Sequence, residues 1–329
     1  MNDLDSAHNL PALAAVVDLG AQCALLAVGR PDPRGGLELI EDHALHPRLG
    51  EGLEEGGALL PEAVERTLEV LVTYARRMDL CGVPPAARHV LCTSPLRTAR
   101  DRDAFLARVQ TLTGVRARVL SSAEEASLGW RGAMGSASRR GELCATATPR
   151  FAIDVGGGST ERVGPAPTDS VSVPMGAVGA TELWIGLRGR APRLLGGWPA
   201  LVAGVRAAFE RESAFNTPLP DGSQCRLLGG SAANLAAILG GLESFDPRLV
   251  DGVEIRADVA ADWAVRLFGM PFEDQLDLPI EPARAPVLAA GLQCLAEALG
   301  RVGGAASVSA RVSARGLRHG ALAQILRLE

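Results

Sequence analysis

The most conspicuous candidate for chemistry is a carboxylate that stands directly before a run of glycines. In FAIDVGGGSTERVG, residues 151–164, an apolar stretch leads to Asp154 and is followed by three consecutive glycines at 156–158. Glycine has no side chain, so nothing separates the backbone of this turn from a ligand above it. The stretch predicts a strand that ends in an acid, followed by a turn that a ligand approaches closely.

A second stretch repeats this pattern. In AAVVDLGAQCALLAVG, residues 14–29, an apolar strand ends near Asp18, and Gly20 opens a small turn before an outgoing strand. The two aspartates are 136 residues apart, about one domain length. Two such copies predict a duplicated fold with one glycine turn in each lobe. If the lobes face each other, both turns point into one cleft. The alternative is two ordinary hairpins with glycine-containing turns.

The elements between the two copies alternate between strand and helix. Apolar residues at helical spacing predict a helix over 60–80. ARHVLCTS (87–94) is typical of a short buried strand, and Ser94-Pro95 predicts the start of a helix that runs to Gly114. VRARVLSS (115–122) predicts a strand, and SSAEEASLGWRGAM (121–134) another helix. This order predicts an α/β protein whose helices cover mixed sheets.

Composition limits the classes of function. The net charge of -5 and pI near 5.7 argue against a nucleic-acid binder. No uncharged apolar run reaches 18 residues, which predicts a cytoplasmic protein with no membrane partner. The six scattered cysteines predict reduced buried thiols, and His43 and His46 favour a surface strand or loop over a zinc site. The chain has no lysine, so a Walker A loop is excluded. A phosphate must be held by arginine, metal, backbone N–H groups or helix N-termini.

Several longer motifs in a fixed order resemble one family, and the resemblance runs from about Ala14 to Leu322. These motifs are RLGEGLEEGGALLPEAVERTLEVL, CTSPLRTARDRDAFLARV, SSAEEASLGWRGAM, IDVGGGSTE, VPMGAVGATE, LLGGSAANLAAIL and VSARGLRHGAL. The chain resembles the exopolyphosphatase / guanosine-pentaphosphate phosphatase (Ppx/GppA) family of the sugar kinase–Hsp70–actin superfamily, in its short two-domain form. The resemblance implies two actin-like, ribonuclease H-like lobes, residues 1–129 and 130–329, with an interdomain cleft. The C-terminal helix near Ala321 is a candidate to pack back on the first lobe.

The resemblance also implies roles for individual residues. Glu125 corresponds to the glutamate that activates the attacking water, and Arg97 to an arginine that grips a phosphate. Asp154 and Glu161 correspond to carboxylates that hold Mg²⁺, and Glu161 also counts among the catalytic residues. The implied phosphate-binding residues are Asp18, Gly20, Gly156, Gly157, Gly158, Ser159, Gly229, Gly230 and Ser231.

Each of these candidates has a purely structural alternative. Both Ser121–Glu124 and Ser122–Glu125 have capping-box spacing, so either glutamate could serve only to start a helix. Arg97 and Asp101 could form an i,i+4 surface pair. Arg48 and Glu51, in RLGEGL, could be loop charges, and Met175-Gly176 favours a turn over a substrate contact.

The first loop departs from the family's pattern, Asp-x-Gly-Ser-Asn-Ser-x-Arg. Here four of its polar positions are occupied by Ala21, Gln22, Cys23 and Leu25. In addition, Asp101 stands where the family usually has asparagine, and Pro286 replaces an acid after Arg284-Ala285. The second loop is intact. These changes put substrate affinity in doubt more than the presence of a water-activating base.

The resulting hypothesis is a Mg²⁺-dependent phosphoanhydride hydrolase that releases terminal phosphate from polyphosphate or from guanosine penta- or tetraphosphate. Such a reaction needs neutralised charge and one oriented water, with little covalent work from the protein. The rival is a weakly active member that binds polyphosphate or guanosine polyphosphate as a sensor. A kinase of the same superfamily is less favoured, because the motifs match the phosphatase branch. The chain is also a candidate to form a homodimer.

Overall fold

The chain folds into two compact units that share one architecture. The computed structural model describes residues 11–33, 35–53, 57–139, 150–165, 169–186, 194, 196–220, 222–303 and 309–328. The first unit comprises Met1–Gly135 and Leu317–Glu329, and the second comprises Ser136–Gly316. The boundary expected after residue 129 falls inside helix α4 (Ser122–Arg139). The interdomain cleft stays a prediction.

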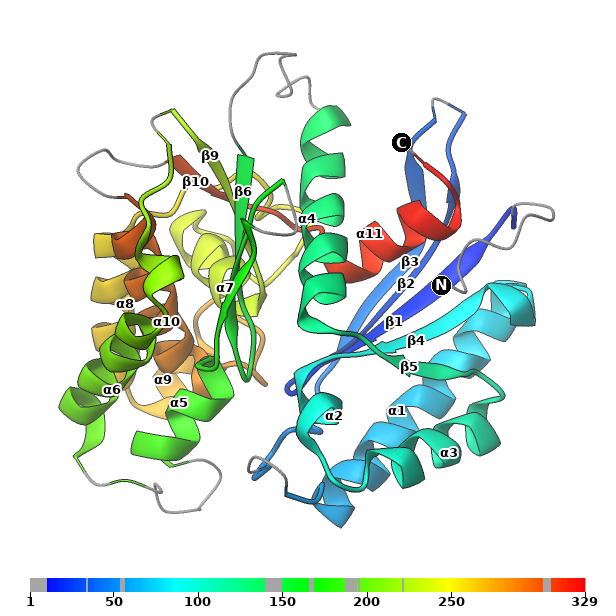
Figure 1. The fold of residues 1–329 in the computed structure, drawn as a ribbon, viewed down its shortest axis with the longest axis horizontal. Coiled ribbons are helices and arrows are strands. Elements are labelled where there is room, and N and C mark those ends of the chain that lie inside the picture. The colour runs from blue at the N-terminus through cyan, green and yellow to red at the C-terminus, as the bar shows by residue number, and fades with distance from the viewer. Residues whose placement is uncertain are drawn as a thin grey trace. The chain divides into compact units, whose positions relative to one another are not determined.

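The first unit is built on a mixed five-stranded sheet with the order β3-β2-β1-β4-β5. β1 pairs antiparallel with β2 and parallel with β4. Helices α1 and α3 lie on one face of the sheet, and α4 and α11 lie on the other (Figure 1). The strands are β1 (Ala14–Leu19), β2 (Ala24–Pro31), β3 (Leu37–Leu45), β4 (Arg88–Cys92) and β5 (Ala117–Val119). The further helices are α1 (Pro61–Leu80), α2 (Ser94–Thr98), α3 (Arg102–Thr113) and α11 (Leu317–Ile325).

The second unit is built on a sheet with the order β10-β9-β6-β7-β8. β6 pairs antiparallel with β7 and parallel with β9, and helices α7 and α10 both pack against β6. The strands are β6 (Arg150–Val155), β7 (Thr160–Val163), β8 (Val171–Val173), β9 (Gln224–Leu228) and β10 (Ser309–Val312). The helices are α5 (Ala177–Trp184), α6 (Gly197–Arg211), α7 (Gly230–Leu239), α8 (Ala257–Gly269), α9 (Phe272–Leu276) and α10 (Ala285–Gly303).

The two sheets have the same topology. Read in opposite directions, both orders place a central strand between an antiparallel hairpin and a parallel neighbour, so that β1 corresponds to β6 and β2 to β7. Asp18 and Asp154 are each the penultimate residue of that central strand. The duplicated α/β fold predicted from the repeated aspartate and glycine is confirmed.

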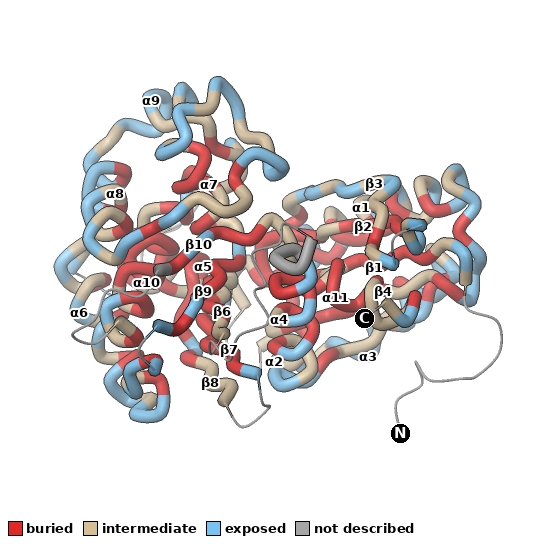
Figure 2. The backbone as a smooth tube through the Cα atoms, turned by 90° about the horizontal axis from the view of Figure 1, so that it is seen from above, coloured by how far each residue is buried: buried red, intermediate tan, exposed pale blue. Residues whose placement is uncertain are grey.

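The central strands lie in the interior of each unit (Figure 2). In β1, residues 14–17 are fully buried without alternation, as expected for a strand covered by helices on both faces. Asp18 therefore follows directly on a fully apolar strand, and it is only half-buried. The core of the unit ends at the point where the candidate site begins.

One predicted element is wrong: the single helix expected from Pro95 to Gly114 is two helices. Ala99 adopts an extended conformation after α2, and the Asp101 carboxylate accepts a hydrogen bond from the Leu59 N–H at 3.1 Å. A contact with the segment before α1 thus interrupts the helix. Asp101 therefore does not form the alternative i,i+4 pair with Arg97. As predicted, α3 ends at Gly114, which has a left-handed backbone with φ 71°.

The last helix, α11, packs against β1 and β2 of the first unit. Its Arg318 and His319 both bind the Asp42 carboxylate on β3, at 2.8 and 3.1 Å. The His319 side chain is 1% exposed, whereas the Asp42 side chain is 29% exposed, so only the histidine side of this contact is buried. The chain's C-terminal residues are thereby fastened to the sheet of its N-terminal unit.

Two further observations concern the predictions from composition. No helix in the described ranges is long and apolar enough to cross a membrane. The described cysteines, Cys23, Cys81, Cys92, Cys225 and Cys294, are all free thiols, and Cys144 lies outside the described residues. A cytoplasmic location and a homodimer stay predictions.

Candidate active-site residues of the two units

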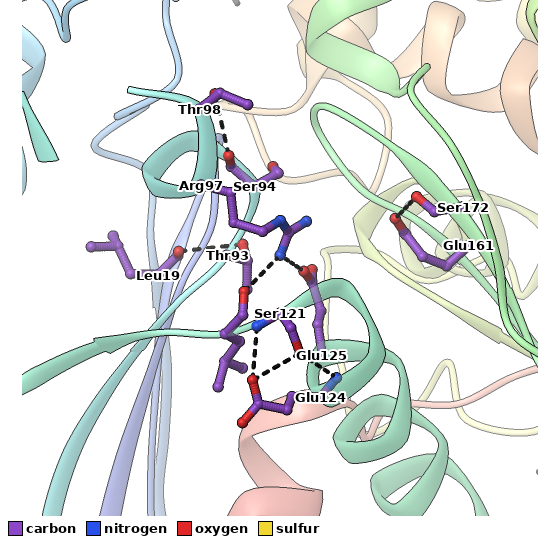
Figure 3. A network of polar contacts seen from close by, with 11 residues as sticks. Leu19, Thr93, Ser94, Arg97, Thr98, Ser121, Glu124, Glu125, Glu161 and Ser172 are labelled. Carbon is purple, nitrogen blue, oxygen red and sulfur yellow. Dashed lines mark hydrogen bonds and ion pairs between the residues drawn. The ribbon is translucent and has the colours of Figure 1, made fainter. Parts of the chain in front are cut away.

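Two carboxylates of the second unit lie side by side on its sheet. Asp154 on β6 is the direct cross-strand partner of Glu161 on β7, and Glu161 is in turn opposite Ser172 on β8. Directly opposed residues of antiparallel strands project from the same face. The Ser172 hydroxyl donates to Glu161 Oε1 at 2.8 Å, and Glu161 is only 5% exposed (Figure 3). The sheet thus presents two neighbouring acids, one of which is held by a hydroxyl.

The glycine loop turns its carbonyl groups toward the protein. Gly156 O accepts the Ala177 N–H at 3.0 Å, and Gly157 O accepts the N–H groups of Val178 and Gly179 at the start of α5. Because C=O and N–H point in opposite directions across a trans peptide, the N–H groups of Gly157 and Gly158 point away from α5. Neither N–H group has a hydrogen-bond partner within the described residues. The loop therefore offers two adjacent donors suited to the oxygens of an anion.

Gly176, the residue directly before α5, is required by this packing. A Cβ on Gly176 would lie 2.6 Å from Gly156 O and 2.7 Å from the Ser159 nitrogen. The Thr160 hydroxyl also donates to Met175 O at 2.7 Å. Met175 and Gly176 thus support the glycine loop from behind, as in the structural alternative considered for them. Ser159 is buried, with 9% of its surface exposed.

The turn at the start of α7 lies against Asp154. Gly229 has φ 88°, and a Cβ there would lie 2.5 Å from Val155 O and 2.9 Å from Asp154 Oδ1. Ser231 is 2% exposed, and its hydroxyl lies against Gly291 of α10. The Ser231 hydroxyl therefore does not face a ligand. The group of Ser231 that could make the predicted phosphate contact is its backbone N–H, in the first turn of α7.

Arg284 belongs to the same region, although no role was predicted for it. Its guanidinium lies so close to Gly230 that a Cβ on Gly230 would be 2.3–2.5 Å from the Arg284 Cζ and nitrogen atoms. The Arg284 side chain is 11% exposed, and its Nε lies 3.5 Å from Glu281 Oε2. The only signal in the sequence was its position in the Arg-Ala-Pro segment. The Gly229-Gly230 turn thus has a carboxylate on one side and a cation on the other.

The second unit meets part of the requirement for a magnesium site. Magnesium is commonly bound through one or two carboxylates, with water and substrate phosphate as the remaining ligands. Asp154 and Glu161 supply two such carboxylates on one face. No cluster of three or more His, Cys, Asp or Glu side chains suited to a metal occurs among the described residues. These two carboxylates therefore suit a metal ion that keeps several water ligands, and they are too few to coordinate an ion by protein ligands alone.

In the first unit, the altered residues of the β1–β2 turn point inward. The turn closes with a hydrogen bond from the Gly20 N–H to Cys23 O at 2.9 Å. Ala21, Gln22 and Cys23 are 9%, 4% and 6% exposed. Cys23 Sγ lies 3.3 Å from His46 Nδ1, so His46 partners a thiol of the loop. His43 instead contacts Glu41 and Arg77, which agrees with the preference for a strand over a zinc site.

The two units differ at one pair of equivalent positions. Leu25 on β2 is opposite Asp18 on β1, just as Glu161 is opposite Asp154. The aspartate of the first unit therefore has an aliphatic neighbour where that of the second unit has a carboxylate. Burial raises the pKa of Asp18 to about 7, with a further upward contribution from the Glu125 carboxylate and an opposing one from Arg318. No hydrogen bond or ion pair to Asp18 occurs among the described residues.

The structure separates the roles of the two adjacent glutamates (Figure 3). Glu124 forms the capping box: its carboxylate accepts the N–H and the hydroxyl of Ser121 at 2.8 Å, and Ser121 Oγ accepts the Glu124 N–H at 3.2 Å. Glu124 also pairs with Arg118 at 2.5 Å. Glu125 points elsewhere, toward Arg97. Helix capping thus accounts for Glu124 and leaves the Glu125 carboxylate for another role.

Glu125 and Arg97 form a close ion pair. Arg97 Nη1 donates to Glu125 Oε2 at 2.5 Å and to Leu120 O at 3.3 Å. The two side chains are only 20% and 19% exposed. Burial raises the pKa of Glu125 above its usual range, against an opposing effect of Arg97. The first unit therefore brings together Arg97, Glu125 and Asp18, the three charged residues predicted for it.

The chain is similar to known proteins in both sequence and structure. The sequence profile of the Ppx/GppA phosphatase family matches residues 31–329. The chain belongs to this family. The match begins after Asp18 and the altered β1–β2 turn, so these residues lie outside it. The chain is also 31% identical over 297 residues to Exopolyphosphatase 2 of Mycobacterium tuberculosis (strain CDC 1551 / Oshkosh), covering 84% of this chain and 86% of that protein.

Solved structures of Ppx/GppA proteins share the fold. An exopolyphosphatase-like protein superposes with a TM-score of 0.81 at 23% identity, covering 95% of this chain and 97% of that one. The exopolyphosphatase of Cytophaga hutchinsonii gives a TM-score of 0.77 at 18% identity, with 96% and 98% covered. The Aquifex aeolicus PPX-GPPA enzyme gives 0.70 at 23% identity, with 94% and 98% covered. The predicted family and its actin-like fold are both confirmed.

Proposed function

We propose that this Ppx/GppA family member is an exopolyphosphatase, which hydrolyses the terminal phosphoanhydride bond of inorganic polyphosphate. The observation that carries the proposal is the glycine loop of the second unit. Two N–H groups that have no hydrogen-bond partner among the described residues, those of Gly157 and Gly158, follow the paired carboxylates of Asp154 and Glu161 in the same sheet. Similarity to Exopolyphosphatase 2 of Mycobacterium tuberculosis supports polyphosphate as the substrate class.

In this proposal the second unit binds phosphate. The N–H groups of Gly157 and Gly158 donate to phosphate oxygens, and the start of α7 at Gly229-Gly230 favours the same negative charge. Asp154 and Glu161 would hold Mg²⁺, which neutralises charge on the phosphate when it is bound. The Ser172 hydroxyl holds Glu161 in position.

In the first unit, Glu125 takes the proton of the attacking water. A carboxylate whose pKa is raised by burial is a stronger base than an exposed one, and general-base catalysis is worth roughly 10²–10⁴-fold in rate. Arg97 orients Glu125 in the free protein. A guanidinium has five N–H donors, so Arg97 can contact a phosphate oxygen without releasing Glu125.

Guanosine penta- and tetraphosphate end in the same kind of bond, and we retain them as second substrates for testing. The sensor alternative rests on the altered β1–β2 turn alone. The residues proposed for water activation and metal binding are all present, which favours turnover over binding without hydrolysis.

The decisive test compares two adjacent glutamates. Phosphate release from long-chain polyphosphate and from guanosine pentaphosphate is measured with Mg²⁺ and with excess chelator. Glu125→Gln is expected to lower turnover by roughly 10²-fold or more. Glu124→Gln is the matched control: it removes the same charge from the capping box and should keep turnover within a few-fold of wild type.

Three results would contradict the proposal: no phosphate release by the wild type, full activity in chelator, or equal losses in both variants. Activity on guanosine pentaphosphate but not on polyphosphate would replace the proposed substrate with the nucleotide.

A further inference from the structure

Arg48 has a backbone conformation that side chains rarely adopt. Its φ is 59°, in the left-handed region that favours glycine. Among the non-glycine residues that the structure describes, only Arg327 also has a positive φ. Such conformations are strained and often occur at functional sites. The sequence explains Arg48 only as a possible loop charge, so its position calls for a physical account.

The segment that contains Arg48 is fastened to the altered β1–β2 turn. The Arg48 N–H donates to Gln22 O at 3.2 Å, and the Gly50 N–H donates to Ala21 O at 2.9 Å. A Cβ on Gly50 would lie 2.7 Å from Ala21 Cβ, so the two segments are in close contact. These contacts place Arg48 directly beside the turn that corresponds to the family's first phosphate loop.

The same segment is also fastened to α1. Arg66 on α1 donates to Pro47 O at 3.0 Å and pairs with Glu51 at 2.8 Å. This pair accounts for Glu51, the other loop charge of RLGEGL, as a structural residue. With Pro47 and Glu51 held on one side and the turn on the other, the backbone of Arg48 has little freedom to move.

The Arg48 side chain, in contrast, makes no polar contact with the part of the chain that the structure describes. Its Nε is buried without a hydrogen-bond partner, and its guanidinium has no hydrogen bond or ion pair among the described residues. Arg162 also has a buried Nε without a partner, but its other nitrogens donate to three backbone carbonyls. A buried, unsatisfied donor is costly and commonly indicates a missing ligand, ion or water.

We propose that Arg48 binds a phosphate group of the substrate chain beside the β1–β2 turn. The proposal rests on the proposed function for the identity of the anion. It assigns to Arg48 the positive charge that the family's first loop carries at position 25, where this chain has Leu25. Arg97 uses Nη1 for Glu125 and Leu120 O and keeps its other donors for a phosphate, so Arg48 would be a second cation for the substrate chain and not a replacement for Arg97.

The test combines binding and kinetics in variants of the full chain. Affinity for tripolyphosphate is measured by isothermal titration calorimetry, KM for long-chain polyphosphate by phosphate release, and Tm by melting. Arg48→Gln is expected to weaken tripolyphosphate binding and to raise KM by about 10- to 100-fold, as for a lost charge-assisted hydrogen bond. Its Tm should match wild type or exceed it, because the guanidinium has no polar partner in residues 11–33, 35–53, 57–139 or the other described ranges.

Two further variants separate this role from others. Arg30→Gln removes the same charge from the opposite end of the same sheet, where Arg30 is exposed and paired with Glu38. It should leave KM within about twofold of wild type. Leu25→Arg in the Arg48→Gln background should recover affinity, because position 25 lies on the face of the sheet that carries Asp18.

The proposal is overturned if Arg48→Gln leaves both the tripolyphosphate Kd and KM unchanged, if Arg30→Gln weakens binding equally, or if Arg48→Gln lowers Tm by several degrees without changing Kd. The calorimetric measurement needs no turnover. If the wild type binds tripolyphosphate and releases no phosphate, the proposed function fails while the role of Arg48 is still decided by the Kd values.

Discussion

Asp18→Asn is expected to stabilise the protein, and increasingly so as the pH rises from about 4 to 7. The variant keeps the shape of the side chain and removes its charge. In the wild type the pKa of Asp18 is raised from 3.8 to about 7, mainly by burial and then by the Glu125 carboxylate. The folded state therefore retains a proton that the unfolded chain releases over this range. The contribution of Asp18 to wild-type stability therefore falls with rising pH, and the asparagine variant is spared this loss.

The size of the effect follows from the two pKa values. Raising the pKa from 3.8 to about 7 corresponds to about 4 kcal/mol against the ionised form. The difference in unfolding free energy between variant and wild type should grow by at most about 1.4 kcal/mol per pH unit between pH 4 and 7. It should then stay constant. Between pH 5 and 7 this amounts to about 2 kcal/mol, or about 4–8 °C in Tm.

The assay is thermal melting of both proteins at pH 5, 6, 7 and 8 in chelator at constant ionic strength. Asp103→Asn, which removes an exposed carboxylate of the same unit, reports the effect of losing one negative charge. The reasoning is refuted if the Tm difference between Asp18→Asn and wild type does not change with pH, or if Asp103→Asn shows the same trend.

Three other outcomes are expected. Gly176→Ala should reduce activity and lower Tm, because a Cβ there has no room beside the glycine loop; activity and melting assays check this. Leu25→Arg in the wild type should lower the KM for polyphosphate by roughly tenfold and reduce the pH dependence of stability, since a guanidinium opposite Asp18 lowers the pKa of that carboxyl. Asp42→Asn should cost about 1–3 kcal/mol, because the hydrogen bonds that Arg318 and His319 donate to the Asp42 carboxylate lose their charged acceptor. Because His319 and Arg318 lower the pKa of Asp42, this cost should be complete above about pH 4 and shrink below it, which melting curves can show.

Much of the fold was predictable because its signals are local. The fully apolar strand before Asp18, the glycines after Asp154 and the repetition of both determine two equivalent hairpins and hence the duplicated fold. Gly114 ends α3 where it was expected, because glycine readily adopts the left-handed backbone conformation that ends a helix, whatever its tertiary surroundings. The interruption between α2 and α3 was not predictable, because it depends on a hydrogen bond from Leu59, which is distant in sequence.

The candidate site was likewise predictable only in part. The sequence by itself determined which residues are the candidates, because carboxylates, arginines and glycine turns are read from residue type and spacing. Spacing alone could not choose between Glu124 and Glu125, which are equally far from a preceding serine, and only the family resemblance favoured Glu125 as the base. Tertiary structure decided which glutamate forms the capping box, by placing Ser121 and Arg118 beside Glu124 and Arg97 beside Glu125.

The raised pKa of Asp18 and the lack of a polar partner for the Arg48 guanidinium among the described residues have the same origin. Both depend on what surrounds a side chain after segments far apart in the chain have packed together: β1 with α11, and the segment around Arg48 with the β1–β2 turn and α1. Residue type sets the charge that a side chain can carry. Its solvation and its partners, which determine what that charge does, exist only in the folded protein.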